Sequence, residues 1–456
     1  MGRVVEMPVW ALILLVAFAA VTFASHFLFP SVRWFFRKRM ERAVAKLNTR
    51  LERPIQPFKL ARRYDMIQRL IYDPEVSLAI GEYARKHGVP ENVAFEQARR
   101  YAREIVPSFS ATAYFTVAIR FAKYLTLALY HVRLNRFHDR HIGDIDPDAT
   151  VIFVMNHRSN MDYVLVTWLA AENSALSYAV GEWARVWPLS RLIKAMGAFF
   201  IRRRSRNALY RRVLARYVGL ATDGGVTQAL YPEGGLSLDG KLAEPKHGLL
   251  KYIVEERTPG KRDVVFVPVA VNYDRVFEDR ILLAAGQSGE RRFRARISLV
   301  GLFVLRQFWF WVTRQYRRHG YAAASFGAPV SLAEFERATP GASVEALAHL
   351  LMKRIGQEVP VLPVPLLARA LLTADTPLSG KALEERVKEM RRDMAIGHPV
   401  LSQDDLTEIL PEALRILEKR GLVVSGPSGY APVVSERPLL EYYANSIGQL
   451  FCDSKI

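Results

Sequence analysis

The feature that most constrains this chain is a nearly continuous apolar run from Pro8 to Phe29, about 22 residues long. An apolar stretch of that length can cross a bilayer core, because a helix satisfies all of its own backbone hydrogen bonds. We therefore expect a retained transmembrane anchor over residues 1–32. A cleaved signal peptide is the alternative, but the run exceeds a usual signal-peptide core and no clear small-x-small cleavage site follows it.

Basic residues follow the apolar run at once and predict its orientation. They are Arg33, Arg37, Lys38, Arg39, Arg42, Lys46 and Arg50. A positive flank of this kind stays on the cytoplasmic side, where it meets anionic lipid headgroups. The expected location is the cell inner membrane, single-pass, with the remainder of the chain in the cytoplasm and membrane lipids as partners.

The excess of basic residues extends over all 456 residues, which carry a formal net charge of +19 and have a pI near 10.0. Such a charge attracts phosphorylated substrates, anionic lipid, an acidic carrier protein or nucleic acid, and it does not choose among them. The single cysteine, Cys452, excludes an intrachain disulfide and a cysteine-rich zinc site.

The hydrophobic pattern predicts a helical region over residues 33–144, followed by an α/β domain over 145–335. In the helical region, the apolar stretch Ala113 to Tyr130 is interrupted by Arg120 and Lys123, which favours a buried or membrane-surface helix over a second span. In the α/β domain, strand-like and helical segments alternate, which predicts a mainly parallel sheet flanked by helices. The strands are expected at 151–155, 177–180, 198–201, 226–231, 264–273 and 322–326.

Two segments of the second half have more than one interpretation. Residues 291–312 combine a basic run with an aromatic, apolar stretch, and they fit an interfacial helix or a buried helix equally well. The last region, 336–456, is expected to be mostly helical, with a helix at 406–419 and a hairpin over 422–434 that resembles a winged helix. A dense basic recognition face is lacking, so nucleic acid is not an expected partner.

The candidate chemistry begins in Asn156-His157-Arg158-Ser159-Asn160-Met161-Asp162, directly after the first expected strand of the α/β domain. If His157 lies in a turn and Asp162 in the first helical turn, the carboxylate can accept the imidazole N–H and leave the other nitrogen free as a base. A His-x4-Asp pair is weak evidence alone. A helix-capping aspartate beside a solvent-facing histidine has the same spacing.

Three further motif blocks follow in order and strengthen the functional interpretation. They are Gly197-Ala198-Phe199-Phe200-Ile201-Arg202-Arg203, Tyr231-Pro232-Glu233-Gly234-Gly235-Leu236-Ser237 and Val267-Pro268-Val269-Ala270-Val271-Asn272-Tyr273. With the histidine block, they make the chain resemble the glycerophosphate/lysophosphatidate acyltransferase family, specifically its glycerol-3-phosphate 1-O-acyltransferase branch. The resemblance is good over about residues 145–330 and looser on either side.

The resemblance implies transfer of a fatty acyl group from an acyl thioester, acyl-CoA or acyl carrier protein, to the sn-1 hydroxyl of glycerol-3-phosphate, the first step of phospholipid synthesis. His157 would be the general base, oriented by Asp162, without a covalent acyl-enzyme. The sequence agrees, since its only cysteine lies in the tail and it lacks a Gly-x-Ser-x-Gly nucleophile elbow. No cofactor and no metal are expected, because the histidines at 138 and 141 have no further placed ligands.

The resemblance also implies a set of substrate-binding residues. They are Arg158, Arg202, Arg203, Glu233, Gly234, Gly235, Lys241, Lys246 and Pro268. Arg202 and Arg203 would hold the acceptor phosphate, since guanidinium groups bind phosphate in a bidentate manner, whereas a solvated basic run is the plainer interpretation. Glu233 and Gly234 would contact the acceptor polyol. Pro268 would shape the acyl-donor side, or simply form a turn.

One departure leaves the acceptor open. Leu236 and Leu238 stand where the branch usually carries arginines, and Lys241 and Lys246 lie close enough in sequence to compensate as point charges. Dihydroxyacetone phosphate or a lysophospholipid is therefore the alternative acceptor. A non-catalytic membrane scaffold that binds lipid phosphates is the alternative of another class.

Overall fold

The computed structural model describes residues 7–49, 51–135, 143–172, 175–181, 189–202, 205, 207–288, 319–394 and 403–451. The chain divides into two compact units, Met1–Ile55 and Gln56–Ile456. Four features predicted above lie outside the described residues, namely Arg203, the 138–141 cluster, the segment 291–312 and Cys452.

The first unit consists mainly of helix α1 (Val9–Asn48). After the helix, the backbone N–H of Ile55 donates to Asn48 Oδ1 at 2.9 Å and fixes the returning chain. The apolar run that predicted an anchor forms the beginning of α1. In the part of the chain that the structure describes, no helix is both long enough and apolar enough to cross a membrane, so the predicted anchor is not supported.

The second unit is built around a sheet to which eight strands contribute among the described residues. Along the sheet the order is β1-β7-β6-β2-β5-β3-β4, and β8 pairs with β6. Neighbouring strands are parallel, except that β6 is antiparallel to β7 and β8. The strands are β1 (His131–Asn135), β2 (Thr150–Met155), β3 (Ser177–Val180), β4 (Phe199–Phe200), β5 (Gln228–Leu230), β6 (Val264–Tyr273), β7 (Tyr321–Phe326) and β8 (Val330–Ser331). The predicted mainly parallel sheet is confirmed.

The centre of the sheet is the parallel pair β2 and β6, in register from Thr150 opposite Val264 to Met155 opposite Val269. Every residue of both strands is buried, as expected for apolar strands covered on both faces. Strand β1 was not predicted, because its sequence His-Val-Arg-Leu-Asn has only two apolar residues. It joins the sheet through β7 and lies before residue 145, where the α/β domain was expected to begin.

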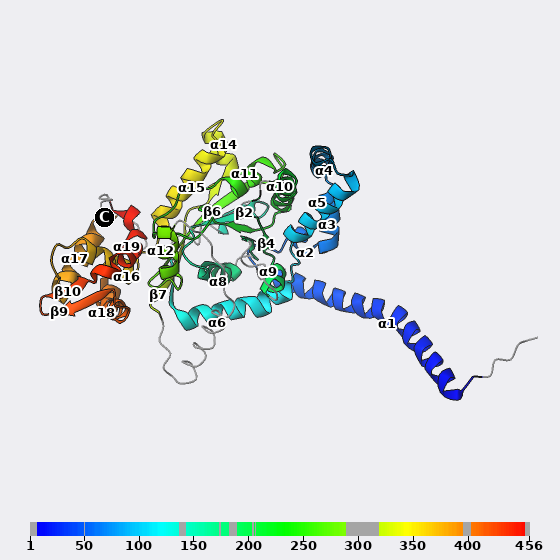
Figure 1. The fold of residues 1–456 in the computed structure, drawn as a ribbon, viewed down its shortest axis with the longest axis horizontal. Helices are drawn as coiled ribbons and strands as arrows, with labels where there is room; N and C mark the ends of the chain where they lie inside the picture. The colour runs from blue at the N-terminus through cyan, green and yellow to red at the C-terminus, as the bar shows by residue number, and fades with distance from the viewer. Residues whose placement is uncertain are drawn as a thin grey trace, which may run out of the picture. The chain divides into compact units, whose positions relative to one another are not determined.

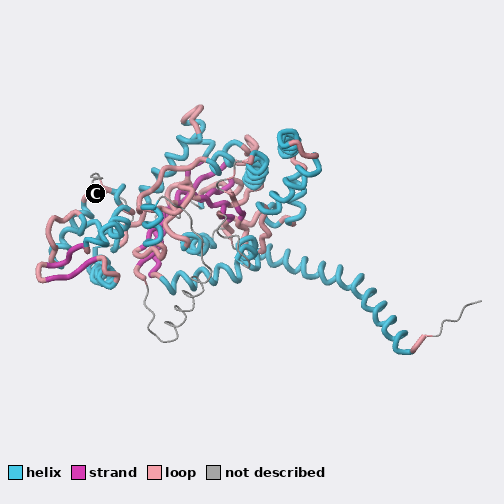
Figure 2. The backbone as a smooth tube through the Cα atoms, in the orientation of Figure 1, coloured by secondary structure: helices cyan, strands magenta, loops and turns pink. Residues whose placement is uncertain are grey.

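Helices lie on both sides of this sheet (Figures 1 and 2). Figure 1 shows α10, α11, α14 and α15 on one side and α6 and α8 on the other. The helices of this region are α6 (Ile119–Leu129), α8 (Met161–Leu169), α9 (Leu189–Ala195), α10 (Ala208–Asp223), α11 (Gly248–Glu255), α12 (Asp279–Ser288), α14 (Leu332–Ala338) and α15 (Val344–Glu358).

A π-helical turn at Ala113–Ala118 leads directly into α6, so the helix predicted over residues 113–130 is present. It is only partly buried. Ala122 and Leu129 face the core, whereas Val117, Phe121 and Tyr124 are exposed at helical spacing.

The predicted N-terminal helices form a cluster that packs on α10. They are α2 (Pro57–Leu60), α3 (Arg63–Ile71), α4 (Pro74–His87) and α5 (Glu91–Ile105). Asp73 begins α4 by accepting the N–H of Glu75, and Gly88 ends it with φ of +60°, a conformation that glycine adopts readily. Asp73 also binds Arg216 of α10 through both oxygens, at 3.0 and 2.9 Å, which ties the cluster to the sheet layer.

The C-terminal region is helical except for one hairpin, as predicted. Its elements are α16 (Pro363–Leu372), α17 (Gly380–Arg392), α18 (Gln403–Lys419), β9 (Val423–Gly426), β10 (Gly429–Pro432) and α19 (Arg437–Asn445). Leu378, between α16 and α17, forms an isolated bridge with Tyr430 of the hairpin, and the resemblance to a winged helix stays a prediction. Helix α16 is buried throughout and packs on α18 and α19.

Candidate active site

All four motif blocks reach one edge of the sheet, and the fourth ends there at Tyr273, the last residue of β6, which is parallel to β2. Strands β2, β5, β3 and β4 are mutually parallel, so their carboxyl ends share that edge. His157 follows β2, Glu233 follows β5, and Arg202 follows β4. The carboxyl edge of a parallel sheet is where open α/β folds place their ligands, so this edge is the candidate site.

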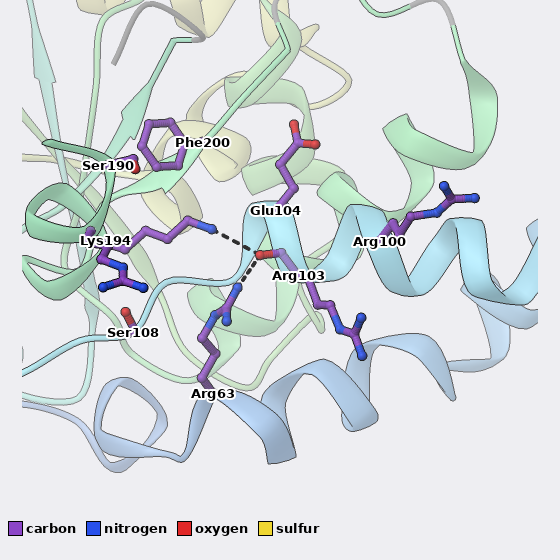
Figure 3. A pocket seen from close by; sticks show the side chains of 9 residues that line it. Arg63, Arg100, Arg103, Glu104, Ser108, Ser190, Lys194 and Phe200 are labelled. Atoms are coloured by element: carbon purple, nitrogen blue, oxygen red, sulfur yellow. Dashed lines mark hydrogen bonds between the residues drawn. The ribbon is translucent and has the colours of Figure 1, made fainter. Parts of the chain in front are cut away.

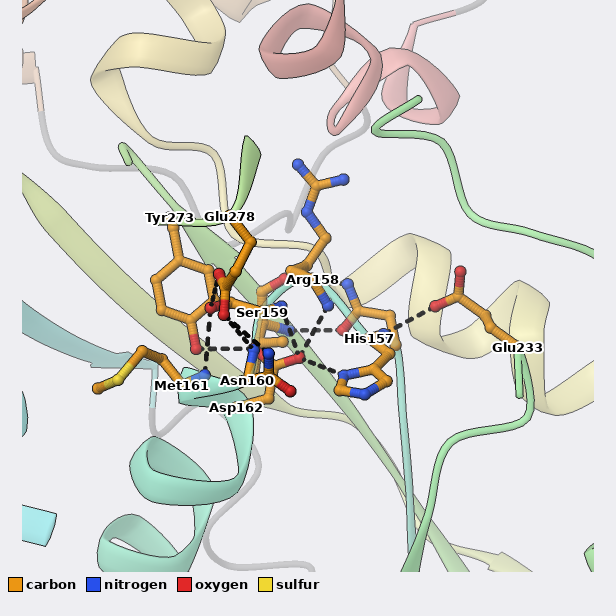
Figure 4. Close-up of polar contacts among 11 residues, drawn as sticks. His157, Arg158, Ser159, Asn160, Met161, Asp162, Glu233, Tyr273 and Glu278 are labelled. Carbon is orange, nitrogen blue, oxygen red and sulfur yellow. Dashed lines mark hydrogen bonds and ion pairs between the residues drawn. The ribbon is translucent and has the colours of Figure 1, made fainter. Parts of the chain in front are cut away.

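His157 and Asp162 are in direct contact there. Nδ1 of His157 lies 2.9 Å from Oδ2 of Asp162 (Figure 4). His157 occupies the turn after β2, and Asp162 lies in the first turn of α8, which brings residues five apart together as the sequence predicted. Their side chains are only 3% and 0% exposed, respectively. The arrangement fixes Nδ1 as the hydrogen-bonded nitrogen and leaves Nε2 for other chemistry.

Three further donors converge on the carboxylate of Asp162. Oδ2 accepts the backbone N–H groups of Arg158, at 2.7 Å, and Ser159, at 3.1 Å. Oδ1 accepts the hydroxyl of Tyr273, at 2.8 Å. Burial, followed by the neighbouring Asp162 charge, raises the pKa of Tyr273 well above its ordinary value, so this hydroxyl remains a donor. Asp162 is therefore held in one orientation by four contacts.

Aromatic rings hold the imidazole of His157 from two sides. Its ring stacks on Tyr231, with centroids 4.0 Å apart and planes 22° apart. Tyr163 contacts it edge-on, with centroids 5.5 Å apart. Tyr231 comes from the third motif block and Tyr163 from α8, so the base is positioned by the packing of two different elements.

Glu233 connects the third block to the first. Its Oε1 accepts the backbone N–H of His157 at 2.8 Å, and its Oε2 accepts that of Ala243 at 3.0 Å. The carbonyl of His157 in turn accepts the N–H of Ser237 at 2.9 Å. Burial raises the pKa of Glu233 to about 7, although both backbone hydrogen bonds oppose this shift. In the structure, Glu233 thus supports the loop that carries the histidine.

The glycines and lysines implied for substrate binding lie in the same loop. Gly234 has φ of +66°, and the side chain of Lys246 packs over it so closely that a Cβ there would lie 2.7 Å from Lys246 Cδ. The N–H of Lys246 donates to the carbonyl of Pro232 at 2.7 Å. Gly235 is half-buried, and Lys241 is exposed. Leu236 and Leu238 pack against the core, so they add no charge to the site.

Arg158 is buried between the site and the C-terminal region. Its guanidinium donates to the carbonyl of Gly240 and lies 4.9 Å from the ring centroid of Tyr442 in α19. Nε and the second Nη have no hydrogen-bond partner among the described residues. A buried guanidinium with two unused donors is suited to bind an anion. The involvement of α19 has no signal in the motif blocks and was not predicted.

Arg202 is placed differently from the other predicted residues. Its guanidinium binds the carboxylate of Glu104 in α5 through two hydrogen bonds, at 2.8 and 2.6 Å. The hydrogen bonds with Glu104 raise the pKa of Arg202 above its ordinary value, despite partial burial. None of the contacts of Arg202 that the structure shows involves His157 or Asp162, so Arg202 shares the edge of the sheet with them without joining their network.

Pro268 lies inside strand β6, so the alternative of a turn-forming proline is wrong. It pairs with Val154 in β2 on one side. On the other side β6 changes partner at this point, from β8 at Val265–Phe266 to β7 at Val269–Tyr273. Proline has no N–H to donate, and this change of partner removes the need for one. Pro268 thus lies at the point along β6 where the neighbouring strand changes from β8 to β7.

Sequence reasoning missed Glu278, which binds the loop between His157 and Asp162. Its carboxylate accepts the hydroxyl of Ser159 at 2.8 Å, the N–H of Asn160 at 3.2 Å and the amide of Asn160 at 2.9 Å. It follows the fourth block by only five residues, and that proximity was the only available signal. Asn156 was within a quoted block, and its amide pairs with the backbone of Val271 at 2.8 and 3.0 Å.

The described residues do not include a candidate set of metal ligands. Among the described residues, no group of three or more His, Cys, Asp or Glu side chains is arranged to hold a metal ion.

Comparison with known proteins agrees with the resemblance of the motif blocks. Residues 136–272 match the acyltransferase family model, and residues 307–454 match the model of the glycerol-3-phosphate acyltransferase C-terminal region. A curated glycerol-3-phosphate acyltransferase of Pseudomonas putida is 27% identical over 353 residues, and one of Alteromonas mediterranea is 26% identical over 424. These alignments cover 72% and 86% of this chain but only 40% and 50% of the relatives, so the chain spans about half their length or less.

Among solved structures, a 1-acyl-sn-glycerophosphate (LPA) acyltransferase from Thermotoga maritima is 17% identical, with a TM-score of 0.31. The alignment covers 61% of this chain and 93% of that one.

Proposed function

We propose that this chain, which carries an acyltransferase domain and a glycerol-3-phosphate acyltransferase C-terminal region, transfers a fatty acyl group from an acyl thioester to the sn-1 hydroxyl of glycerol-3-phosphate. The observation that carries the proposal is the buried contact of 2.9 Å between His157 Nδ1 and Asp162 Oδ2. The curated names of the relatives support the choice of acceptor.

His157 would act as a general base in a single ternary complex. Nε2 accepts the proton of the acceptor hydroxyl while the hydroxyl oxygen bonds to the thioester carbonyl carbon. Asp162 stabilises the resulting imidazolium and keeps the ring in one orientation. The tetrahedral intermediate then collapses, the carbon–sulfur bond breaks, and the imidazolium returns the proton to the thiolate. The products are the acyl ester and the free thiol.

Two arginines would neutralise the acceptor phosphate. Arg158 adjoins the base and has unused donors, whereas Arg202 can reach the acceptor phosphate only when its side chain leaves Glu104 and turns from β4 toward β2. Such an exchange replaces the two oxygens of a carboxylate with two oxygens of a phosphate and leaves the arginine paired in both states. Lys246, packed on Gly234 in the loop after β5, adds a further positive charge.

The experiment measures acyl transfer by wild type and His157→Ala, in detergent, from labelled acyl-CoA and acyl carrier protein thioesters. The acceptors are glycerol-3-phosphate, dihydroxyacetone phosphate and lysophosphatidate. His349→Ala, an exposed histidine on α15, is the matched control. We expect turnover on glycerol-3-phosphate that falls by a factor of about 10² to 10⁴ in His157→Ala and is unchanged in the control.

Two outcomes would reject the proposal in different ways. Activity that survives in His157→Ala would exclude this histidine as the base. Wild-type turnover restricted to dihydroxyacetone phosphate or lysophosphatidate would move the assignment to another acceptor. Binding to anionic liposomes without turnover on any acceptor would favour the non-catalytic scaffold.

A further inference from the structure

A cavity of about 620 Å³ lies beside strand β4 (Figure 3), and none of its lining residues is one of those that contact His157. We call it the cationic cavity. Its lining comes from α3, α5, α9 and β4 and consists of Arg63, Arg100, Arg103, Glu104, Ser108, Ser190, Arg191, Lys194 and Phe200. Its volume is in the range of small-molecule binding sites. Apart from Phe200, no lining residue belongs to the motif blocks.

The cavity has an excess of positive charge. Four arginines and one lysine line it against a single carboxylate, Glu104, which already binds Arg202. In the described parts of the chain, none of the four lining arginines has a carboxylate within ion-pair distance. Burial, followed by repulsion from Arg103, lowers the pKa of Arg63. An anionic ligand would relieve this repulsion.

The wall of the cavity is held by the protein itself. Arg63 Nε donates to the carbonyl of Val106 at 3.0 Å, and its terminal nitrogen donates to the carbonyl of Arg103. Lys194 Nζ donates to the same carbonyl of Arg103 at 3.1 Å, so α3, α5 and α9 meet at one oxygen (Figure 3). Arg100, Arg103 and Arg191 are exposed, and their guanidinium groups have no ion pair with a carboxylate of the described residues, so they can turn toward a ligand.

The cavity is also far from the base. Strands β5 and β3 separate β4 from β2, so three inter-strand spacings of about 4.8 Å place β4 roughly 14 Å from the strand that carries His157. A three-carbon acceptor whose hydroxyl meets His157 cannot also place its phosphate in the cavity. A ligand that fills the cavity and also reacts at His157 must therefore be long, with an anionic end and a reactive end.

We infer that the cationic cavity binds the phosphorylated nucleotide of a coenzyme A thioester, whose pantetheine arm runs along the carboxyl ends of β3 and β5 to bring the thioester to His157. This inference rests on the proposed function. The nucleotide carries several phosphates, which suits five cations in one concave site, whereas an acidic carrier protein is folded and docks on a surface without entering a cavity.

The test is the triple variant Arg100→Gln/Arg103→Gln/Arg191→Gln, which leaves Arg63 and Lys194 to hold the wall. Its control is Lys353→Gln/Arg354→Gln/Lys381→Gln, three exposed cations on α15 and α17 that give the same change in net charge. The measurements are KM for acyl-CoA, KM for glycerol-3-phosphate and kcat, together with calorimetric binding of adenosine 3′,5′-bisphosphate.

We expect the triple variant to raise KM for acyl-CoA roughly tenfold. The Kd for adenosine 3′,5′-bisphosphate should rise by a similar factor, since each partly exposed ion pair contributes modestly. The control, kcat and KM for glycerol-3-phosphate should not change. Arg191→Gln alone should give a smaller shift in the same direction.

Three results would overturn the inference. They are a rise in KM for glycerol-3-phosphate instead of acyl-CoA, a rise in KM for acyl carrier protein thioesters only, and wild-type protein that does not bind adenosine 3′,5′-bisphosphate. The calorimetric measurement needs no turnover. A wild type that binds the nucleotide but transfers no acyl group would therefore reject the proposed function and keep the nucleotide site.

Discussion

The His157 network and the cationic cavity lie at the same edge of one sheet, yet they differ in how their charged groups are paired. Around Asp162, one carboxylate meets four donors, and the side chains of Asp162 and His157 are both buried. In the cavity, five cations share one carboxylate that is already engaged. The first arrangement pairs its one carboxylate fully without ligand, whereas the second has an excess of positive charge among its lining residues that an anion would offset. The difference separates a preorganised catalytic group from a binding site that relies on its substrate for neutrality.

The largest effect should come from Asp162→Asn, which removes one of the two acceptor oxygens at the centre of the His157 network. The amide nitrogen cannot accept, so the backbone donors of Arg158 and Ser159 compete with His157 for one oxygen and the imidazole loses its fixed tautomer. We expect kcat to fall by about 10³-fold or more, comparable to the loss known for the buried aspartate of a catalytic triad. Steady-state assays with circular dichroism would check this. Asp393→Asn, an exposed site at the end of α17, should show no loss, and a fall below tenfold in Asp162→Asn would contradict the orienting role.

The next effect concerns Glu233, the buried carboxylate that joins the loop after β5 to the loop that carries His157. Its pKa is about 7 in the folded chain against an ordinary 4.5, so the native state binds more protons than the unfolded state between these values. The free energy of unfolding should therefore decrease as pH rises from 4.5 to 7, by on the order of 3 kcal/mol from this group. Glu233→Gln should remove that part of the slope.

Denaturant unfolding at several pH values measures this slope. Asp274, whose pKa burial also raises to about 7, remains in the variant and should preserve a second contribution of the same sign. Asp274→Asn is thus the matched comparison. If the pH dependence of the free energy of unfolding were unaltered in Glu233→Gln, Glu233 would bind protons equally in the folded and unfolded states.

A smaller effect is expected from Tyr273→Phe, which removes one of the four donors to Asp162. One lost hydrogen bond to a charged group corresponds to about 1.5–3 kcal/mol, so kcat should fall by roughly 10- to 100-fold while KM for either substrate is retained. Tyr430→Phe, in the distant hairpin, is the control. If Tyr273→Phe were as inactive as His157→Ala, the phenol would have a role beyond positioning.

The smallest effect should be seen at the Glu104–Arg202 pair, on the border of the cationic cavity. Glu104→Gln removes a partly exposed ion pair, so the free energy of unfolding should change by less than about 1 kcal/mol. The freed Arg202 should bind the acceptor phosphate more readily and lower KM for glycerol-3-phosphate a few-fold. An increase in that KM would mean that Glu104 positions Arg202 for the acceptor instead of competing with it.

The sequence predicted the α/β core well because the signals there are local. The apolar run 264–273 became β6 with the same bounds, and the turn between β2 and α8 brought His157 to Asp162 as expected. Prediction from the sequence failed for side chains whose contact partner is distant along the chain. The pairing of Arg202 with Glu104, the support of Asn160 by Glu278 and the contact of Arg158 with Tyr442 each depend on a neighbour that periodicity and motif spacing do not identify.

The contact between the first motif block and α19 also bears on how this protein comes to be active during its synthesis. Gly240 approaches Tyr442 so closely that a Cβ would lie 1.9 Å from the Tyr442 carbonyl, and the ring of Tyr442 covers Arg158. Chains fold from the N-terminus as they leave the ribosome. The α/β core can therefore assemble early, but the surroundings of Arg158 are finished only after α19 has emerged. A nascent or prematurely terminated chain would contain the histidine and the aspartate without a complete enclosure around them.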